Sequence, residues 1–257
     1  MTRWVAFAAL TLTLLAFVLI SARSSERVVS ELAAEATAHE PTVSDGADHL
    51  RAVGGYGEGT PVETVSSMAL LANVGASHAL FAVVLLLGIW VAGVPVDTLG
   101  VGIGVTGWIA VSIGLAVGLA IAAINTLLSR VLDGDPSADL RELLAPDSPA
   151  GWVVLLGVVL PLIAGFEELL FRAVLIGAFS VGFGLSPWLL AVASSIAFAA
   201  GHGAQGRLGI VATGVLGFVL AAVFVVTESL LVVVVAHYLI NAVEFGLEGV
   251  GDGPFSG

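Results

Sequence analysis

Long apolar runs, separated by short polar segments, make up most of the chain. They fall at residues 4–20, 68–91, 101–128, 151–181, 187–200, 210–226 and 230–247. About 20 residues of helix cross the hydrocarbon core of a bilayer, and most of these runs are of that order. The runs are continuously apolar and lack the period-two alternation of membrane β-strands. The pattern therefore predicts an all-α, polytopic bundle of transmembrane helices.

The number of spans depends on the run at 151–181. As one straight helix it would be about 46 Å long at 1.5 Å per residue, against a hydrocarbon core of about 30 Å. It forms either one long helix or two pieces that break near Pro161 and Gly165, so we expect seven or eight spans. With seven spans, the positive-inside rule places the N-terminus outside the cell and most arginine-bearing loops in the cytoplasm.

Polar segments divide the chain into parts. We expect an uncleaved first span rather than a signal peptide, because the region before Arg23 lacks a convincing small-x-small cleavage site. A surface helix is expected at 26–40 within the polar segment that follows. The predicted parts are a first span (1–20), an acidic extramembrane segment (21–66), two spans with an acidic loop (67–149), a bundle of the last spans (150–248) and a flexible tail (249–257).

The amino-acid composition supports a membrane protein and indicates the kind of organism and membrane in which it works. Hydrophobic residues make up 58% of the 257 residues, and the mean hydropathy is +1.08. Asp and Glu number 20 against 8 Arg and no Lys, for a net charge of −12. Such a surface suits the cell membrane of a halophilic archaeon, although a GC-rich genome that prefers Arg to Lys would leave the same signature. No basic stripe is present, so we expect a lipid bilayer and no nucleic acid among the partners.

The chain contains no cysteine. This excludes disulfides, a thiol nucleophile and thiolate metal sites. A metal site would have to use His, Asp, Glu or Asn.

Ionisable residues inside apolar runs are costly, and they are therefore candidates for function. Glu168 and Arg172 are four residues apart on a helix and are expected to form an ion pair. Glu167 is rotated by about 100° from Glu168 and lacks that partner, which suits a general base. A purely structural ion pair that fixes helix packing is the competing interpretation.

Two more polar positions lie in the last spans. His202 ends one span, and the turn at 184–187 makes a helical hairpin that places it level with Glu167. His237 and Asn241 are four residues apart and share a helix face with Glu244. A polar stripe on an apolar helix must face the bundle interior, as part of either a site or a hydrogen-bonded seam. Asn73, His78 and Asn125 are expected to be packing polar groups.

Three motifs in sequence resemble one family. Glu167-Glu168-x-x-x-Arg172, Phe198-x-x-x-His202 and His237-x-x-x-Asn241 are similar to the motifs of the CPBP family, the CAAX proteases and bacteriocin-processing enzymes, also called type II CAAX prenyl endopeptidases or Abi proteins. The resemblance implies a catalytic helix bundle within 150–248 and cleavage of a membrane-embedded or lipidated (CAAX-like) peptide. It covers nothing before about residue 151.

The resemblance also implies roles. Glu167 would activate water together with His202, and His237 and Asn241 would stabilise the oxyanion, while Glu168, Arg172 and Phe198 would orient or support them. The same set of Glu167, His202, His237 and Asn241 would serve as ligands if zinc is used, and a metal-free glutamate mechanism is equally compatible. Other classes remain open: a non-catalytic scaffold or bacteriocin-immunity protein, and an ion or proton transporter. The physiological substrate and oligomeric state are not predicted.

Overall fold

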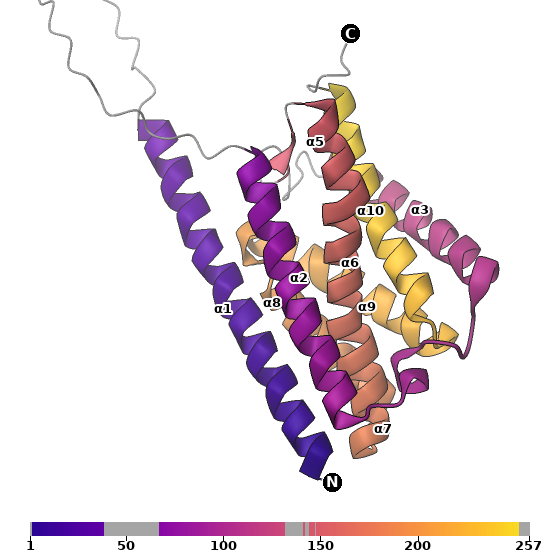
Figure 1. The fold of residues 1–257 in the computed structure, drawn as a ribbon. Helices are drawn as coiled ribbons and strands as arrows, with labels where there is room; N and C mark the ends of the chain where they lie inside the picture. The colour runs from indigo at the N-terminus through magenta and orange to yellow at the C-terminus, as the bar shows by residue number, and fades with distance from the viewer. Residues whose placement is uncertain (1, 39–66, 132–140, 142–143, 147, 252–257) are drawn as a thin grey trace, which may run out of the picture.

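The computed structural model describes residues 2–38, 67–131, 141, 144–146 and 148–251 (Figure 1). These residues form helices and turns, and no strand occurs among them, which confirms the all-α prediction. The helices are α1 (Thr2–Ala38), α2 (Ser67–Ala92), η1 (Val96–Leu99), α3 (Gly107–Val131), α5 (Pro149–Val154), η2 (Leu155–Val159), α6 (Leu160–Glu168), η3 (Leu169–Ala178), α7 (Phe179–Phe183), α8 (Pro187–Ala200), η4 (Gly203–Gln205), α9 (Gly206–Thr227) and α10 (Leu230–Gly251).

Six helices in the described part of the chain are long and apolar enough to cross a membrane, and α8 is a shorter apolar helix. The elements from α5 to α7 join end to end as one helix over Pro149–Phe183. The predicted break near Pro161 is therefore not present. The six candidate spans of the described residues, together with the shorter α8, are roughly consistent with the expected seven or eight. A π-helical stretch, η2, immediately precedes the turn that contains Pro161, so wider turns adjoin the residue that lacks an N–H donor.

The polar segments are only partly described. Residues 26–38 are helical, but as an unbroken continuation of α1 rather than as a separate surface helix. The rest of the expected acidic segment (39–66), most of the acidic loop before α5 and the end of the expected tail (252–257) lie outside the described residues.

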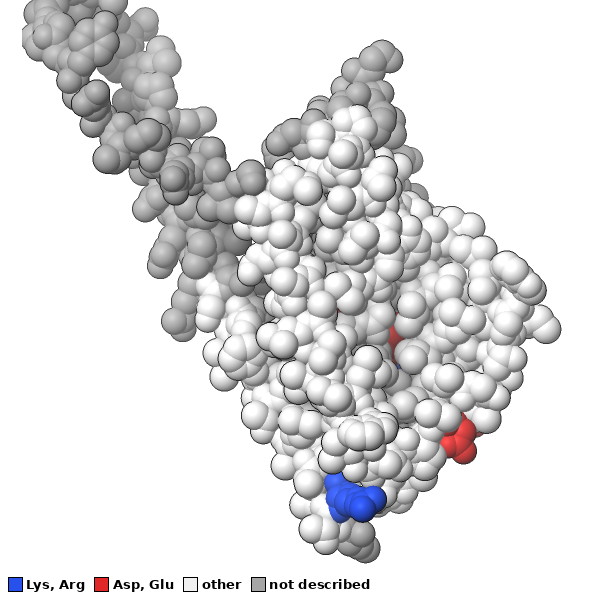
Figure 2. All heavy atoms as spheres, viewed as in Figure 1, with Lys and Arg blue, Asp and Glu red and all other residues white. Residues whose placement is uncertain are grey.

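The outer surface is apolar, as a lipid-facing surface should be. Trp108, Trp90 and Val226 are among its most exposed side chains, at 85%, 77% and 74%. Figure 2 shows one face that is mostly uncharged: one blue and one red patch lie toward its lower end, and a little red is visible at mid-height, in a hollow. Inside the bundle, by contrast, the charged side chains of Glu168 and Arg172 are buried.

The long helix Pro149–Phe183 lies in the centre of the bundle. Figure 1 shows α1 and α2 along one flank of it and α10 with α3 along the other, while α8 and α9 lie behind. The N-terminus is at one end of the bundle, and the C-terminal end of α10 is at the other. The three stretches that carry the sequence motifs, on α6–η3, α8 and α10, are thus neighbours.

Candidate active site

Glu168 is the hub of the buried polar cluster. Its Oε1 accepts a hydrogen bond from Nη1 of Arg172 at 2.7 Å and another from Nδ1 of His237 at 2.7 Å. The expected pair between Glu168 and Arg172 is therefore present, and its two side chains are 0% and 1% exposed. Charged groups removed from water need this kind of partner, because an unpaired charge in the interior is strongly destabilising. Glu168 thus links the central helix to α10.

Arg172 extends the cluster to two further helices. Its Nη2 donates to the carbonyl oxygen of Gly217 on α9 at 3.0 Å. Its guanidinium carbon lies 4.7 Å from the ring centroid of Phe198 on α8, close enough for a cation–π contact. A Cβ at position 217 would lie 3.0 Å from the Phe198 ring, so glycine allows α9 to come this close. One guanidinium therefore contacts the central helix, α8 and α9.

The orientation of His237 follows from its bond to Glu168. Because Nδ1 donates to that carboxylate, Nε2 is the nitrogen left for chemistry. Nε2 lies 3.6 Å from Oε2 of Glu167, whose side chain is 15% exposed. The neighbouring glutamates therefore have different environments: Glu168 holds the imidazole from one side, and Glu167 faces its other nitrogen.

His202 is oriented in the same manner by its own helix. Its Nδ1 donates to the carbonyl oxygen of Phe198 at 2.8 Å, which again leaves Nε2 available. The Phe198 ring packs 4.5 Å from the ring of His202 and 6.0 Å from that of His237, measured between centroids. Phe198 therefore packs against both imidazoles.

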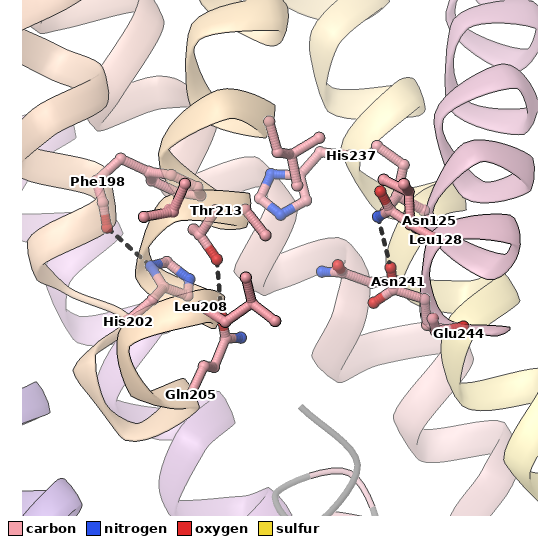
Figure 3. A pocket seen from close by; sticks show the side chains of 16 residues that line it. Asn125, Leu128, Phe198, His202, Gln205, Leu208, Thr213, His237, Asn241 and Glu244 are labelled. Atoms are coloured by element: carbon pink, nitrogen blue, oxygen red, sulfur yellow. Dashed lines mark hydrogen bonds between the residues drawn. The ribbon is translucent and has the colours of Figure 1, made fainter. Parts of the chain in front are cut away.

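Phe198 and His202 line a cavity of about 270 Å³. Figure 3 shows His202 on one side, Asn125 and Glu244 on the other, and the Asn241 amide between them. His237 also lines the cavity. Glu167 is not among the lining residues, and it is connected to the cavity through its approach to Nε2 of His237. The structure thus brings the residues of all three motifs together.

Comparison with known proteins agrees with this arrangement. Residues 149–243 match the family model of the "Type II CAAX prenyl endopeptidase Rce1-like" proteins. This part of the chain resembles the CPBP family. The matched segment runs from α5 to α10 and includes all three motifs. No curated protein and no solved structure gives a match. The match, together with the candidate membrane spans, indicates a CAAX-type protease of the membrane.

Within this CPBP segment, the helix changes form next to the hub. The π-helical stretch η3 begins at Leu169, directly after Glu168, and includes Arg172. Such stretches are uncommon and occur often at functional sites. Glu168 and Arg172 still bond across four residues, so the wider turns keep the pair intact.

Zinc binding would need a set of ligands that converge. In the described part of the chain, no group of three or more His, Asp or Glu side chains is arranged to hold a metal ion. Of the predicted ligands, Glu167 and His237 approach one another, while His202 bonds to the Phe198 carbonyl of its own helix. This arrangement does not present a ligand set for zinc, and the zinc site stays a prediction.

Other polar residues sort into two groups. His78 bonds to the Val74 carbonyl of its own helix and packs against Phe166, as expected of a packing group. Asn125 does more than the sequence predicted, because it lines the cavity and bonds to Glu244. Gln205, which bonds to Thr213 at the cavity wall, was not predicted. No periodicity links these residues to the motifs, so only the packing of helices reveals them.

Proposed function

We propose that this CPBP protein hydrolyses a peptide bond of a membrane-embedded or lipidated substrate, using a water molecule activated by Glu167. One observation carries the proposal. A carboxylate that has no ion pair with Arg172 lies 3.6 Å from the available nitrogen of His237, beside a cavity that His202 and Asn241 also line. Such a cluster, inside a bundle with an apolar outer surface, suits acid–base chemistry on a peptide at membrane depth.

In the first step, Glu167 takes a proton from water while the water oxygen attacks the carbonyl carbon of the scissile bond. His202 assists through Nε2, since its Nδ1 is held by the Phe198 carbonyl. General-base assistance of this kind contributes about 10²–10⁴-fold to a rate.

In the second step, negative charge develops on the former carbonyl oxygen. The amide of Asn241, and Nε2 of His237 when it carries a proton, donate hydrogen bonds to this oxyanion. Glu168 fixes the ring of His237 for that purpose by accepting from Nδ1. The C–N bond then breaks, and the proton on Glu167 passes to the leaving nitrogen. The products are a carboxylic acid and an amine.

The test is cleavage of a reporter peptide with an isoprenoid near its C-terminus, by purified protein in liposomes. We expect Glu167→Gln to lower kcat by about 10²–10⁴-fold, because glutamine cannot take the proton. Glu228→Gln is the matched control: Glu228 caps α9 at the turn before α10 and does not line the cavity.

Other outcomes would point elsewhere. Equal cleavage by Glu167→Gln and the parent protein would contradict the proposal. A parent protein that does not cleave but carries ions across the liposome membrane would favour a transporter. Activity that is lost on chelation and restored by Zn²⁺ would show that a metal takes part.

A further inference from the structure

The helix α3 packs closely against α10, which carries His237 and Asn241. α3 lies outside residues 149–243, the segment that matches the family model. A Cβ on Gly114 of α3 would lie 2.7 Å from the carbonyl oxygen of Val232, and one on Gly118 would lie 2.8 Å from that of Ala236. Such distances allow no side chain, so the two backbones pack directly together. The contact with Ala236 is one residue before His237. α3 is therefore in position to fix where the His237 face of α10 points.

The same face of α3 ends in a polar contact. Asn125 lies seven residues, or about two turns, beyond Gly118, and the buried Ala122 lies between them. The Asn125 amide Nδ2 donates to Oε1 of Glu244 on α10 at 2.9 Å. The small residues let the helices approach, and Asn125 then holds them at one register.

Glu244 is held from a second direction. Its other oxygen, Oε2, lies 3.7 Å from Nη1 of Arg141, in the connection between α3 and α5. The Arg141 side chain is 9% exposed and that of Glu244 is 23% exposed. The two oxygens of one carboxylate are thus engaged by different parts of the chain, which restricts rotation of the helix that carries it.

Glu244 is also in register with the motif residues of α10. It lies three residues after Asn241 and seven after His237, which places all three on one helix face. All three, together with Asn125, line the cavity. Consider an atom that lies about 6 Å from the axis of α10. A rotation of the helix by about 10° would displace this atom by about 1 Å. A misplacement of about 1 Å at a catalytic group can lower a rate about 10²-fold.

We propose that Asn125 and Arg141 are positioning residues, which act through Glu244 to keep the His237–Asn241 face of α10 directed into the cavity. The proposal rests on the proposed function, because the effect on rate requires His237 and Asn241 to take part in cleavage. It assigns a role to α3 and to the connection after it, which the family segment does not include.

The first test measures kcat and KM of Asn125→Ala on the reporter peptide in liposomes. We expect kcat to fall about 10–100-fold with little change in KM, because the substrate still binds while the donors are misdirected. Thr126→Val is the matched control, since Thr126 bonds only to the Ala122 carbonyl of its own helix among the contacts described. An unchanged kcat for Asn125→Ala would overturn the proposal.

A second test separates positioning from general stability. If Asn125 acts through α10, Asn125→Ala should cost less in an Asn241→Ala background than in the parent protein, because only His237 is then left to be misplaced, whereas loss by partial unfolding would be the same in both. The exchange Arg141→Glu with Glu244→Arg should recover activity that either single substitution loses. Losses that multiply, or an exchange that recovers nothing, would count against the proposal.

A third readout does not depend on cleavage. Spin labels on cysteines at the exposed positions Leu127 and Leu247 would report the distance between α3 and α10. We expect a narrow distribution in the parent protein and a broad or shifted one in Asn125→Ala. If the parent protein does not cleave the reporter but Asn125→Ala still alters the distance distribution, only the proposed function is refuted. If Asn125→Ala leaves the distribution unaltered, the positioning role is refuted.

Discussion

The adjacent carboxylates of Glu167 and Glu168 have different surroundings, because their side chains point in different directions. Glu168 is 0% exposed and accepts from both Arg172 and His237, so its charge is used within the fold. Glu167 is 15% exposed and approaches only His237 among the ion pairs of the described residues. The spacing of Glu168 and Arg172 sufficed to predict their pair, because it lies within one helix. The bond from His237 to Glu168 spans 69 residues, and no local pattern could have indicated it.

This difference predicts that the two glutamates respond differently to the same substitution. Glu168→Gln removes the negative charge beside a buried guanidinium and should destabilise the protein by about 3–5 kcal/mol. Glu167→Gln should lower kcat by about 10²–10⁴-fold and leave stability nearly unchanged. Thermal unfolding of both variants in one detergent measures the contrast, with Glu228→Gln as the control. Equal losses of Tm for Glu167→Gln and Glu168→Gln would contradict the assignment.

At the scale of whole elements, apolar runs were enough to locate the helices, and a four-residue spacing was enough to define the polar face of α10. The partner of that face could not be predicted, because α3 has an apolar sequence that could pack on any neighbour. The close approach at Gly114 and Gly118 becomes apparent only when the backbones of both helices are placed. The π-helical form of η3 was similarly unpredictable, since its residues are ordinary helix formers in an apolar run.

Glycine substitutions test the contact between α3 and α10. Gly118→Ala should destabilise the protein and lower activity, because the new Cβ meets backbone atoms of Ala236 on α10 that cannot move independently. Gly246→Ala is the control on α10, where a Cβ meets no atom of the described residues within 4 Å. Because alanine favours helix over glycine, that control should be neutral or stabilising by up to about 1 kcal/mol. Thermal unfolding and reporter cleavage measure both; similar behaviour of the two variants would refute the close contact.

At the scale of the whole molecule, the candidate site lies toward one end of the bundle. Phe183 packs against Trp4 near the start of α1, with ring centroids 6.4 Å apart, so the turn at 184–186 is at the N-terminal end. The site end is opposite, because a Cβ on Gly201, next to His202, would lie 3.5 Å from Leu19, late in the first span. The sequence could not fix this depth for His202, since the hairpin places it only relative to Glu167 and not relative to the ends of the bundle.

The positive-inside rule then predicts that the site opens toward the cytoplasm. Arg3 lies at the N-terminal end of the bundle, whereas Arg23 and Arg207 lie toward the site end. Because the chain has no cysteine, single cysteines can be labelled in intact cells with a membrane-impermeant maleimide. We expect labelling of Ser186→Cys and none of Arg207→Cys until the cells are broken. The reverse pattern would place the site on the outer side.

The pairing of Glu168 with Arg172 has a consequence for how the protein enters the bilayer. Both residues belong to one helix, and their ion pair therefore needs no other part of the protein. A helix that neutralises its own charges can leave the insertion machinery before α8, α9 and α10 have been synthesised. Those helices then arrive at a cluster that already exists, and each adds one contact: the ring of Phe198, the carbonyl of Gly217 and the imidazole of His237. We therefore expect one carboxylate to serve twice: Glu168 would first neutralise arginine during insertion and would later support a histidine.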